Sequence, residues 1–128
     1  MQKRHPENRP KNLNLFTIRL PINALVSILH RVSGVGLFLL LPLMMFALQQ
    51  SLVSDASYLA LNKMLSHWLV KIFLIVCSWA FFHHFYAGIR HLLQDVHWMT
   101  SLQKTRFTGR VVLVLVGFSV LIFAWGIF

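Results

Sequence analysis

Three long apolar stretches without a charged side chain constrain the fold of this chain more than any other feature. They comprise residues 32–54, 72–89 and 111–128. A helix needs about 20 apolar residues to cross the ~30 Å hydrocarbon core of a bilayer. Only 12% of the residues are charged, against about 25% in soluble domains, so the chain has too little polar surface to face water.

We therefore predict an all-α membrane protein with three transmembrane helices in an up-down-up arrangement. The predicted spans cover about residues 25–51, 64–92 and 108–128. Pro21 marks the entry to the first helix, where its missing N–H costs nothing. Residues 1–20 are predicted to form an N-terminal segment outside the membrane, 21–128 the anchor domain, and 51–62 a loop on the outer side. We expect no cleavable signal peptide, because the first apolar stretch is too long for one.

The distribution of basic residues predicts the orientation. Five precede the first span, namely Lys3, Arg4, Arg9, Lys11 and Arg19. Four lie between the second and third spans, namely Arg90, Lys104, Arg106 and Arg110. Because cytoplasmic segments carry the excess of Lys and Arg, we predict a cytoplasmic N-terminus and a C-terminus on the outer side. The net charge of +9 does not indicate nucleic-acid binding, because the basic residues are scattered between apolar stretches.

A first polar cluster lies at the start of the first span. Ser27, His30 and Arg31 are three and four residues apart and share one helix face. A hydroxyl, an imidazole and a guanidinium together suit hydrogen bonding to a carbonyl head group or to an anionic propionate. The alternative is an anchor at the membrane edge, with His30 and Arg31 meeting lipid phosphates.

A second cluster lies in the second span, where His84, Gly88, His91 and Asp95 form one stripe along the helix. His84 lies inside the membrane, so its imidazole needs a partner such as a metal or cofactor, or else a hydrogen bond to a neighbouring helix. Gly88 leaves room for a flat macrocycle. His91 is two turns, roughly 10 Å, from His84, too far to bind the same iron. It, Arg90 or Arg31 could instead meet a propionate.

The remaining ionisable and reactive side chains carry no site prediction. His83 points about 100° away from His84 on the helix. His5, His67 and His97 lie in or near polar segments. Cys77 is the single cysteine, which excludes an internal disulfide or a CxxC motif, and we interpret it as a buried apolar side chain.

Two motifs carry a resemblance to a known family. One is Arg9-Pro10 followed by Ser27-x-x-His30-Arg31-x-Ser33-Gly34. The other is His84-x-x-x-Gly88-Ile89-Arg90-His91-Leu92-x-x-Asp95. With the three-span layout, the chain resembles the cytochrome b556 membrane-anchor subunit of bacterial succinate dehydrogenase, respiratory complex II. Gln94 departs from the family pattern, which prefers Met or an aromatic residue there and so leaves a packing detail in question.

The resemblance implies a role for each matched position. Ser27 and Arg31 would help to form a ubiquinone site, completed by the iron–sulfur subunit and a second small anchor. His84 would be one axial ligand of haem b, and a His of the second anchor the other. His30, Arg31 and His91 would neighbour the haem propionates, and Asp95 would lie near the quinone-side interface. The family also implies a multi-pass protein of the bacterial inner membrane, with its C-terminus in the periplasm.

The predicted function is that of a non-catalytic, electron-transferring anchor of a succinate:quinone oxidoreductase in the tricarboxylic acid cycle and respiratory chain. The chain shows no flavin site, Cys cluster or dicarboxylate pocket, so succinate chemistry would belong to a flavoprotein partner. One alternative is the cytochrome b anchor of another quinone-linked dehydrogenase, which would usually supply both haem ligands from one chain. Another is a non-redox membrane adaptor whose His and Arg residues only anchor or pair.

Overall fold

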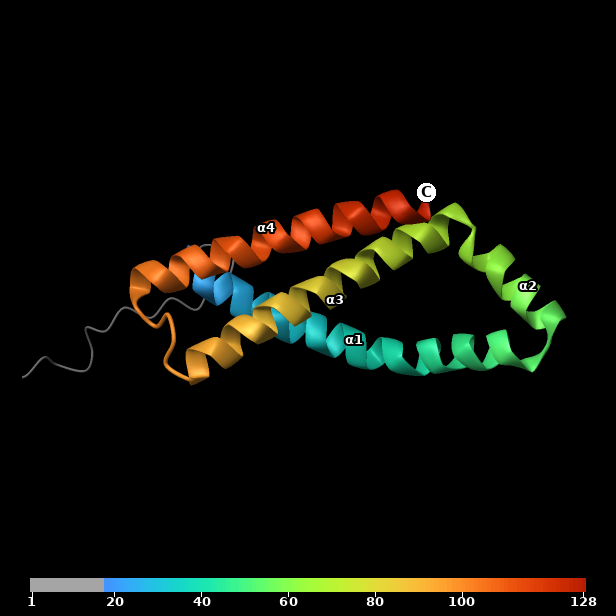
Figure 1. The fold of residues 1–128 in the computed structure, drawn as a ribbon, viewed down its shortest axis with the longest axis horizontal. Helices are drawn as coiled ribbons and strands as arrows, with labels where there is room; N and C mark the ends of the chain where they lie inside the picture. The colour runs from blue at the N-terminus through green and yellow to red at the C-terminus, as the bar shows by residue number, and fades with distance from the viewer. Residues whose placement is uncertain (1–17) are drawn as a thin grey trace, which may run out of the picture.

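The computed structural model describes residues 18–128, and this part of the chain is entirely helical apart from its connections. Its helices are α1 (Ile22–Val53), α2 (Asp55–Leu65), α3 (Trp68–Asp95) and α4 (Leu102–Ile127), as Figure 1 shows. The three longest, α1, α3 and α4, are long and apolar enough to cross a membrane. The predicted all-α class with three helices able to span a membrane is confirmed. The Arg9-Pro10 motif and four of the basic residues used for the orientation lie outside the described residues.

Helix α1 begins where the sequence predicts. Pro21 is extended (φ −65°, ψ 153°), and its carbonyl accepts hydrogen bonds from the N–H groups of Ala24 and Leu25. The helix then continues through Pro42 as far as Val53. Membrane helices tolerate an internal proline because neighbouring groups can satisfy the freed backbone carbonyl.

Residues 51–62, predicted as an outer loop, are helical except at Ser54, so the prediction of a loop conformation is wrong. Ser54 is extended (φ −165°, ψ 163°) and caps α2: its hydroxyl accepts from the Ser57 N–H at 3.2 Å. The Ser57 hydroxyl in turn accepts from the Ser54 N–H at 3.1 Å, which completes a capping box. The predicted second span also began too early, because residues 64–65 belong to α2 and α3 starts at Trp68. His67 caps α3 through its Nδ1 atom, which accepts from the Leu69 N–H at 3.3 Å.

The three long helices meet near the beginning of α1, where α1 crosses α3 and α4 lies along α3 (Figure 1). At the opposite end α1 and α3 diverge, and α2 connects them. The buried core sits at the crossing and consists of Val26, Ala87, Val112 and Val116. The C-terminus lies beside the start of α3, with Lys71 Nζ 5.0 Å from the centre of the Phe128 ring.

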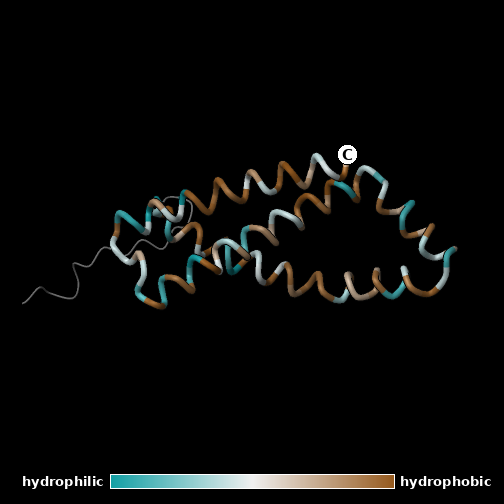
Figure 2. Tube along the Cα trace, in the orientation of Figure 1, coloured by the Kyte–Doolittle hydropathy of each residue, from teal (hydrophilic) through white to brown (hydrophobic). Residues whose placement is uncertain are grey.

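Most of the apolar surface faces outward. Figure 2 shows hydrophobic residues along the long helices, with hydrophilic residues gathered toward their ends and in α2. Phe38 is 71% exposed and Trp125 is 90% exposed. Apolar area on this scale is unfavourable in water, whereas lipid chains cover it at no cost. The molecule is a multi-pass membrane protein.

Candidate functional site

The crossing of α1 and α3 brings three histidines together. The rings of His30, from α1, and His84, from α3, are stacked, with centroids 4.2 Å apart and planes inclined by 3°. His91 approaches the same His30 ring edge-on, at 5.1 Å and 61°. His30 therefore lies between the two histidines that the sequence places two turns apart on one stripe of α3. The three imidazoles form a cluster at this end of the molecule, which we call the histidine cluster.

A backbone contact fixes the chemical form of His84. Its Nδ1 atom lies 3.1 Å from the carbonyl oxygen of His30. A carbonyl oxygen can only accept, so Nδ1 carries a proton, and in the neutral imidazole Nε2 then keeps its lone pair. The side chain is half-buried. Residues 18–128 bring no three His, Cys, Asp or Glu side chains together as a metal site. His84 can therefore offer a metal one ligand atom, its Nε2.

Two glycines make this close crossing possible. A Cβ atom at Gly34 would lie 2.8 Å from His84 Cε1 and 3.1 Å from its Nδ1, closer than real Cβ contacts. A Cβ at Gly88 would lie 3.3 Å from His30 Nε2. Each helix thus carries a glycine opposite a histidine of the other. The space at Gly88, which the sequence predicts to leave room for a flat macrocycle, is bordered by the His30 imidazole.

Ser27 and Arg31 flank His30 on α1. The Ser27 side chain is half-buried and Arg31 is exposed. One helical turn separates them, so the hydroxyl and the guanidinium lie on the same side of α1. Within residues 18–128, neither α3 nor α4 covers Arg31. Its guanidinium is therefore accessible to a molecule outside the bundle.

His83 faces the interior of the bundle. It is fully buried, its Nε2 lies 3.3 Å from the Val26 carbonyl, and its ring stacks on Trp79 at 5.6 Å. Its Nδ1 is buried without a hydrogen-bond partner among the described residues. His83 and His84 therefore have separate environments, and of the two only His84 belongs to the histidine cluster. This agrees with the interpretation of His83 as a structural residue.

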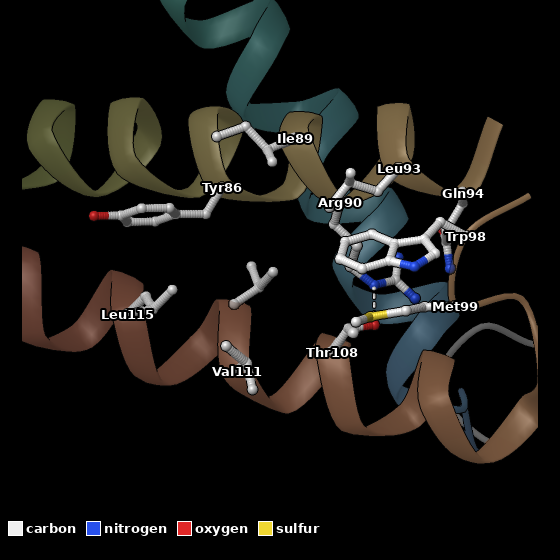
Figure 3. Close-up of a pocket in the computed structure, with 11 residues that line it drawn as sticks. Tyr86, Ile89, Arg90, Leu93, Gln94, Trp98, Met99, Thr108, Val111 and Leu115 are labelled. Atoms are coloured by element: carbon white, nitrogen blue, oxygen red, sulfur yellow. Dashed lines mark hydrogen bonds between the residues drawn. The ribbon is translucent and has the colours of Figure 1, made fainter. Parts of the chain in front are cut away.

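Arg90 takes a different position from the one suggested by its place in the motif. It is 6% exposed and points toward α4, where its Nε donates to the Thr108 hydroxyl at 3.2 Å (Figure 3). Its Nη2 donates to Asn23 Oδ1 at 3.1 Å and to the Thr105 carbonyl at 3.2 Å. In this position the Arg90 side chain points toward α4 and is not placed to meet a propionate beside His84. The side chain is held by three neutral acceptors from α1 and α4.

Sequence reasoning missed the partners of Arg90. Thr105 and Thr108 are three residues apart on α4 and so share a face, which was the available signal. Asn23 completes the group through its Nδ2, which donates to the Thr105 hydroxyl at 3.1 Å. We call Asn23, Arg90, Thr105 and Thr108 the Arg90 network.

A pocket of about 230 Å³ lies beside the Arg90 network, between α3, α4 and the segment that joins them. Figure 3 shows Arg90 and Thr108 toward one end and Tyr86 and Leu115 toward the other. Its lining is mostly apolar and includes none of the three histidines of the cluster. In the joining segment, His97 and Met99 have positive φ (61°).

Comparison with known proteins places the chain in a family. The sequence profile of the succinate dehydrogenase/fumarate reductase transmembrane subunit matches residues 5–123. The chain belongs to this family. A succinate dehydrogenase cytochrome b556 subunit of Coxiella burnetii is 39% identical over 108 residues, covering 83% of this chain and 86% of the relative. The subunit of the same name from Rickettsia bellii is 34% identical over 115 residues, covering 89% and 90%. A succinate dehydrogenase cytochrome b560 subunit of Porphyra purpurea is 34% identical over 90 residues, covering 69% of this chain and 72% of the relative.

For this member of the transmembrane subunit family, the structure groups part of the predicted site. His30, His84 and His91 come together. Ser27 and Arg31 lie beside them on α1, while Arg90 belongs to the other side of α3. Asp95 is the exposed last residue of α3.

Proposed function

We propose that this chain is the haem b-binding membrane-anchor subunit of a succinate dehydrogenase, a succinate:quinone oxidoreductase that passes electrons to ubiquinone. The observation that carries the proposal is the environment of His84. Its Nδ1–H is held by the His30 carbonyl, and its Nε2 lone pair has no hydrogen-bond partner within residues 18–128. The names of the relatives, cytochrome b556 subunits of succinate dehydrogenase, support the assignment.

The residues at the crossing fit a haem. A histidine that binds a metal almost always donates its other ring N–H to a carbonyl or carboxylate, which sets the tautomer and ring orientation. His84 has this arrangement. When bound between two imidazoles, haem b supplies a one-electron carrier without an open iron position. His84 would hold one side of it, and His30, Arg31 and His91 would donate hydrogen bonds to its propionates.

The second axial ligand would come from the second small anchor. His30 is not placed to be that ligand, because its ring lies face to face on the His84 ring at 4.2 Å, whereas two histidines that bind one haem iron approach it nitrogen-first from opposite sides. A cytochrome b anchor that supplies both ligands from one chain is therefore the less favoured candidate. The same reasoning makes a second anchor subunit part of the proposal.

Ser27 and Arg31 would form this chain's part of a ubiquinone site. A hydroxyl and a guanidinium both donate hydrogen bonds to a quinone carbonyl oxygen, and Arg31 is exposed at the end of the bundle. Arg19, Arg106 and Arg110 lie near this same end, which we assign to the cytoplasmic side of a bacterial inner membrane. The helices would then run up-down-up with the C-terminus in the periplasm. The iron–sulfur subunit and second anchor would complete the site, and the flavoprotein would oxidise succinate.

The test of the proposal is a reduced-minus-oxidised spectrum of the purified complex. We expect a b-type absorption that is lost in His84→Ala, because the substitution removes the iron ligand. The matched control is His67→Ala, an exposed histidine at the other end of α3, which should keep the spectrum. A complex without haem, or one whose haem spectrum is the same in His84→Ala, would contradict the assignment and favour a non-redox adaptor or a different ligand.

A further inference from the structure

Besides His30, two residues of α1 bear on His84: Gly34 lies against its ring, and Ser33 shares the His30 carbonyl with it, and the proposed function gives neither a role. We propose that Ser33 and Gly34 are positioning residues for His84: Gly34 sets where the imidazole lies, and Ser33 tunes the hydrogen bond that sets its proton. The inference rests on the proposed function, because it takes His84 as the haem ligand.

Gly34 provides the space in which the His84 ring lies. The ring is bounded on one face by the parallel ring of His30. A side chain at residue 34 would meet both Cε1 and Nδ1, the first at 2.8 Å. The ring could relieve that contact only by rotating away from the His30 carbonyl or by separating α1 from α3. Either movement would change the direction in which Nε2 points.

The His30 carbonyl receives hydrogen bonds from two side chains. Ser33 Oγ donates to it at 3.0 Å and His84 Nδ1 at 3.1 Å. Ser33 is 1% exposed, so water does not compete for its hydroxyl. Two donors that share one acceptor weaken each other, because each withdraws electron density from the same oxygen. Ser33 therefore limits how strongly the carbonyl can polarise the His84 N–H.

This sharing has a direct consequence for the ligand. A stronger hydrogen bond from Nδ1–H makes the imidazole a better electron donor at Nε2. A better donor favours the oxidised iron and lowers the reduction potential. Ser33 is thus expected to keep the potential higher than the carbonyl alone would set it.

The first experiment compares Gly34→Ala with Gly36→Ala in the complete complex. A Cβ at Gly36 has no atom within 4 Å, so this variant is a matched control two residues along the same helix. We expect Gly34→Ala to lose most of the haem, or to keep haem with a shifted low-spin electron paramagnetic resonance signal, and Gly36→Ala to match the parent in both. Gly34→Ala with parental haem content and an unshifted signal would overturn the role of Gly34.

The second experiment involves no steric clash and so remains informative if Gly34→Ala does not assemble. It compares the haem midpoint potential of Ser33→Ala with that of Ser78→Ala. Ser78 is also buried and donates to a carbonyl of its own helix, that of Ile75 at 2.8 Å, but no histidine shares that carbonyl. We expect a more negative potential in Ser33→Ala and no change in Ser78→Ala.

An unchanged or more positive potential in Ser33→Ala would overturn the tuning role. These failures are distinguishable from failure of the proposed function. In that case the parent complex would contain no haem, or its spectrum would not depend on His84. A complex with His84-dependent haem whose signal and potential ignore both substitutions would retain the function and refute the positioning.

Discussion

Single residues at the start of α1 separate quinone chemistry from succinate chemistry in our proposal. We expect Arg31→Ala to lower quinone reduction by about tenfold or more, since a hydrogen bond to a charged group contributes roughly 1.5–3 kcal/mol, and Ser27→Ala to lower it by about two- to tenfold, since a neutral one contributes roughly 0.5–1.5 kcal/mol. Succinate oxidation with an artificial dye acceptor should persist, because the succinate site lies in another subunit. Steady-state assays with both acceptors on the purified complex measure the difference. The control is Ser51→Ala, at the opposite end of α1, where the hydroxyl bonds only to Leu48 of its own helix. Equal loss of both activities would contradict a separate quinone role.

Sequence spacing alone predicts some contacts of the candidate site and not others. The interval from His84 to Gly88 and His91 selects one stripe of α3, and the structure joins its two histidines through His30. The contact of Gly34 with His84 could not be predicted, because it depends on the depth at which two helices cross. The hydrogen bonds of Arg90 to α4 could not be predicted for a related reason. A long side chain at a stripe's edge can follow either neighbouring helix, and the hydroxyl groups of α4 decided it.

At the scale of elements, the short helix α2 depends on its cap. Ser54→Ala removes the acceptor for the Ser57 N–H and should cost about 1 kcal/mol of local stability. Hydrogen exchange of the α2 amides would then be roughly fivefold faster, while α3 and α4 keep their protection. Ser66→Ala is the control at the other end of α2, where the hydroxyl donates to the Asn62 carbonyl. Unchanged exchange in Ser54→Ala would show that packing rather than the cap holds α2.

The long helices were predictable and α2 was not, for physical reasons. A stretch without charge of this length has one stable form in a bilayer, so length and composition suffice for α1, α3 and α4. Helix α2 contains Asp55, Asn62 and Lys63, and its longest apolar run is only residues 58–61, so its composition resembles a loop. Its capping box uses Ser57 in place of the usual Glu or Gln, which hides the signal.

At the scale of the whole molecule, α3 divides two kinds of interaction. Its His84 side meets α1 through stacked rings and glycines. Its Arg90 side meets α4 through hydroxyl groups, including the bond between Tyr86 and Ser119 at 3.0 Å. Polar side chains on the Arg90 side hold the helices together, because lipid provides no hydrophobic driving force for helices to associate. The proposed cofactor side can then stay open to a partner subunit while the other side maintains the bundle.

Because the Arg90 network lies on the side of α3 that holds the bundle together, substituting Arg90 should lower stability without changing the proposed cofactor side. Arg90→Ala removes the link between α1, α3 and α4 and leaves Asn23 and Thr108 without their donor, at a cost of about 3 kcal/mol. Arg90→Lys should cost less but still destabilise, because an ammonium cannot reproduce the guanidinium geometry. Thermal unfolding of the purified complex measures both, with exposed Arg110→Ala as the control. At low temperature the haem spectrum of Arg90→Ala should equal that of the parent, because the hydrogen bonds of the Arg90 side chain go to Asn23, Thr105 and Thr108 and not to the histidine cluster. A spectrum altered in the folded variant would show instead that Arg90 acts on the cofactor side, and stability equal to that of Arg110→Ala would show that apolar packing alone joins the three helices.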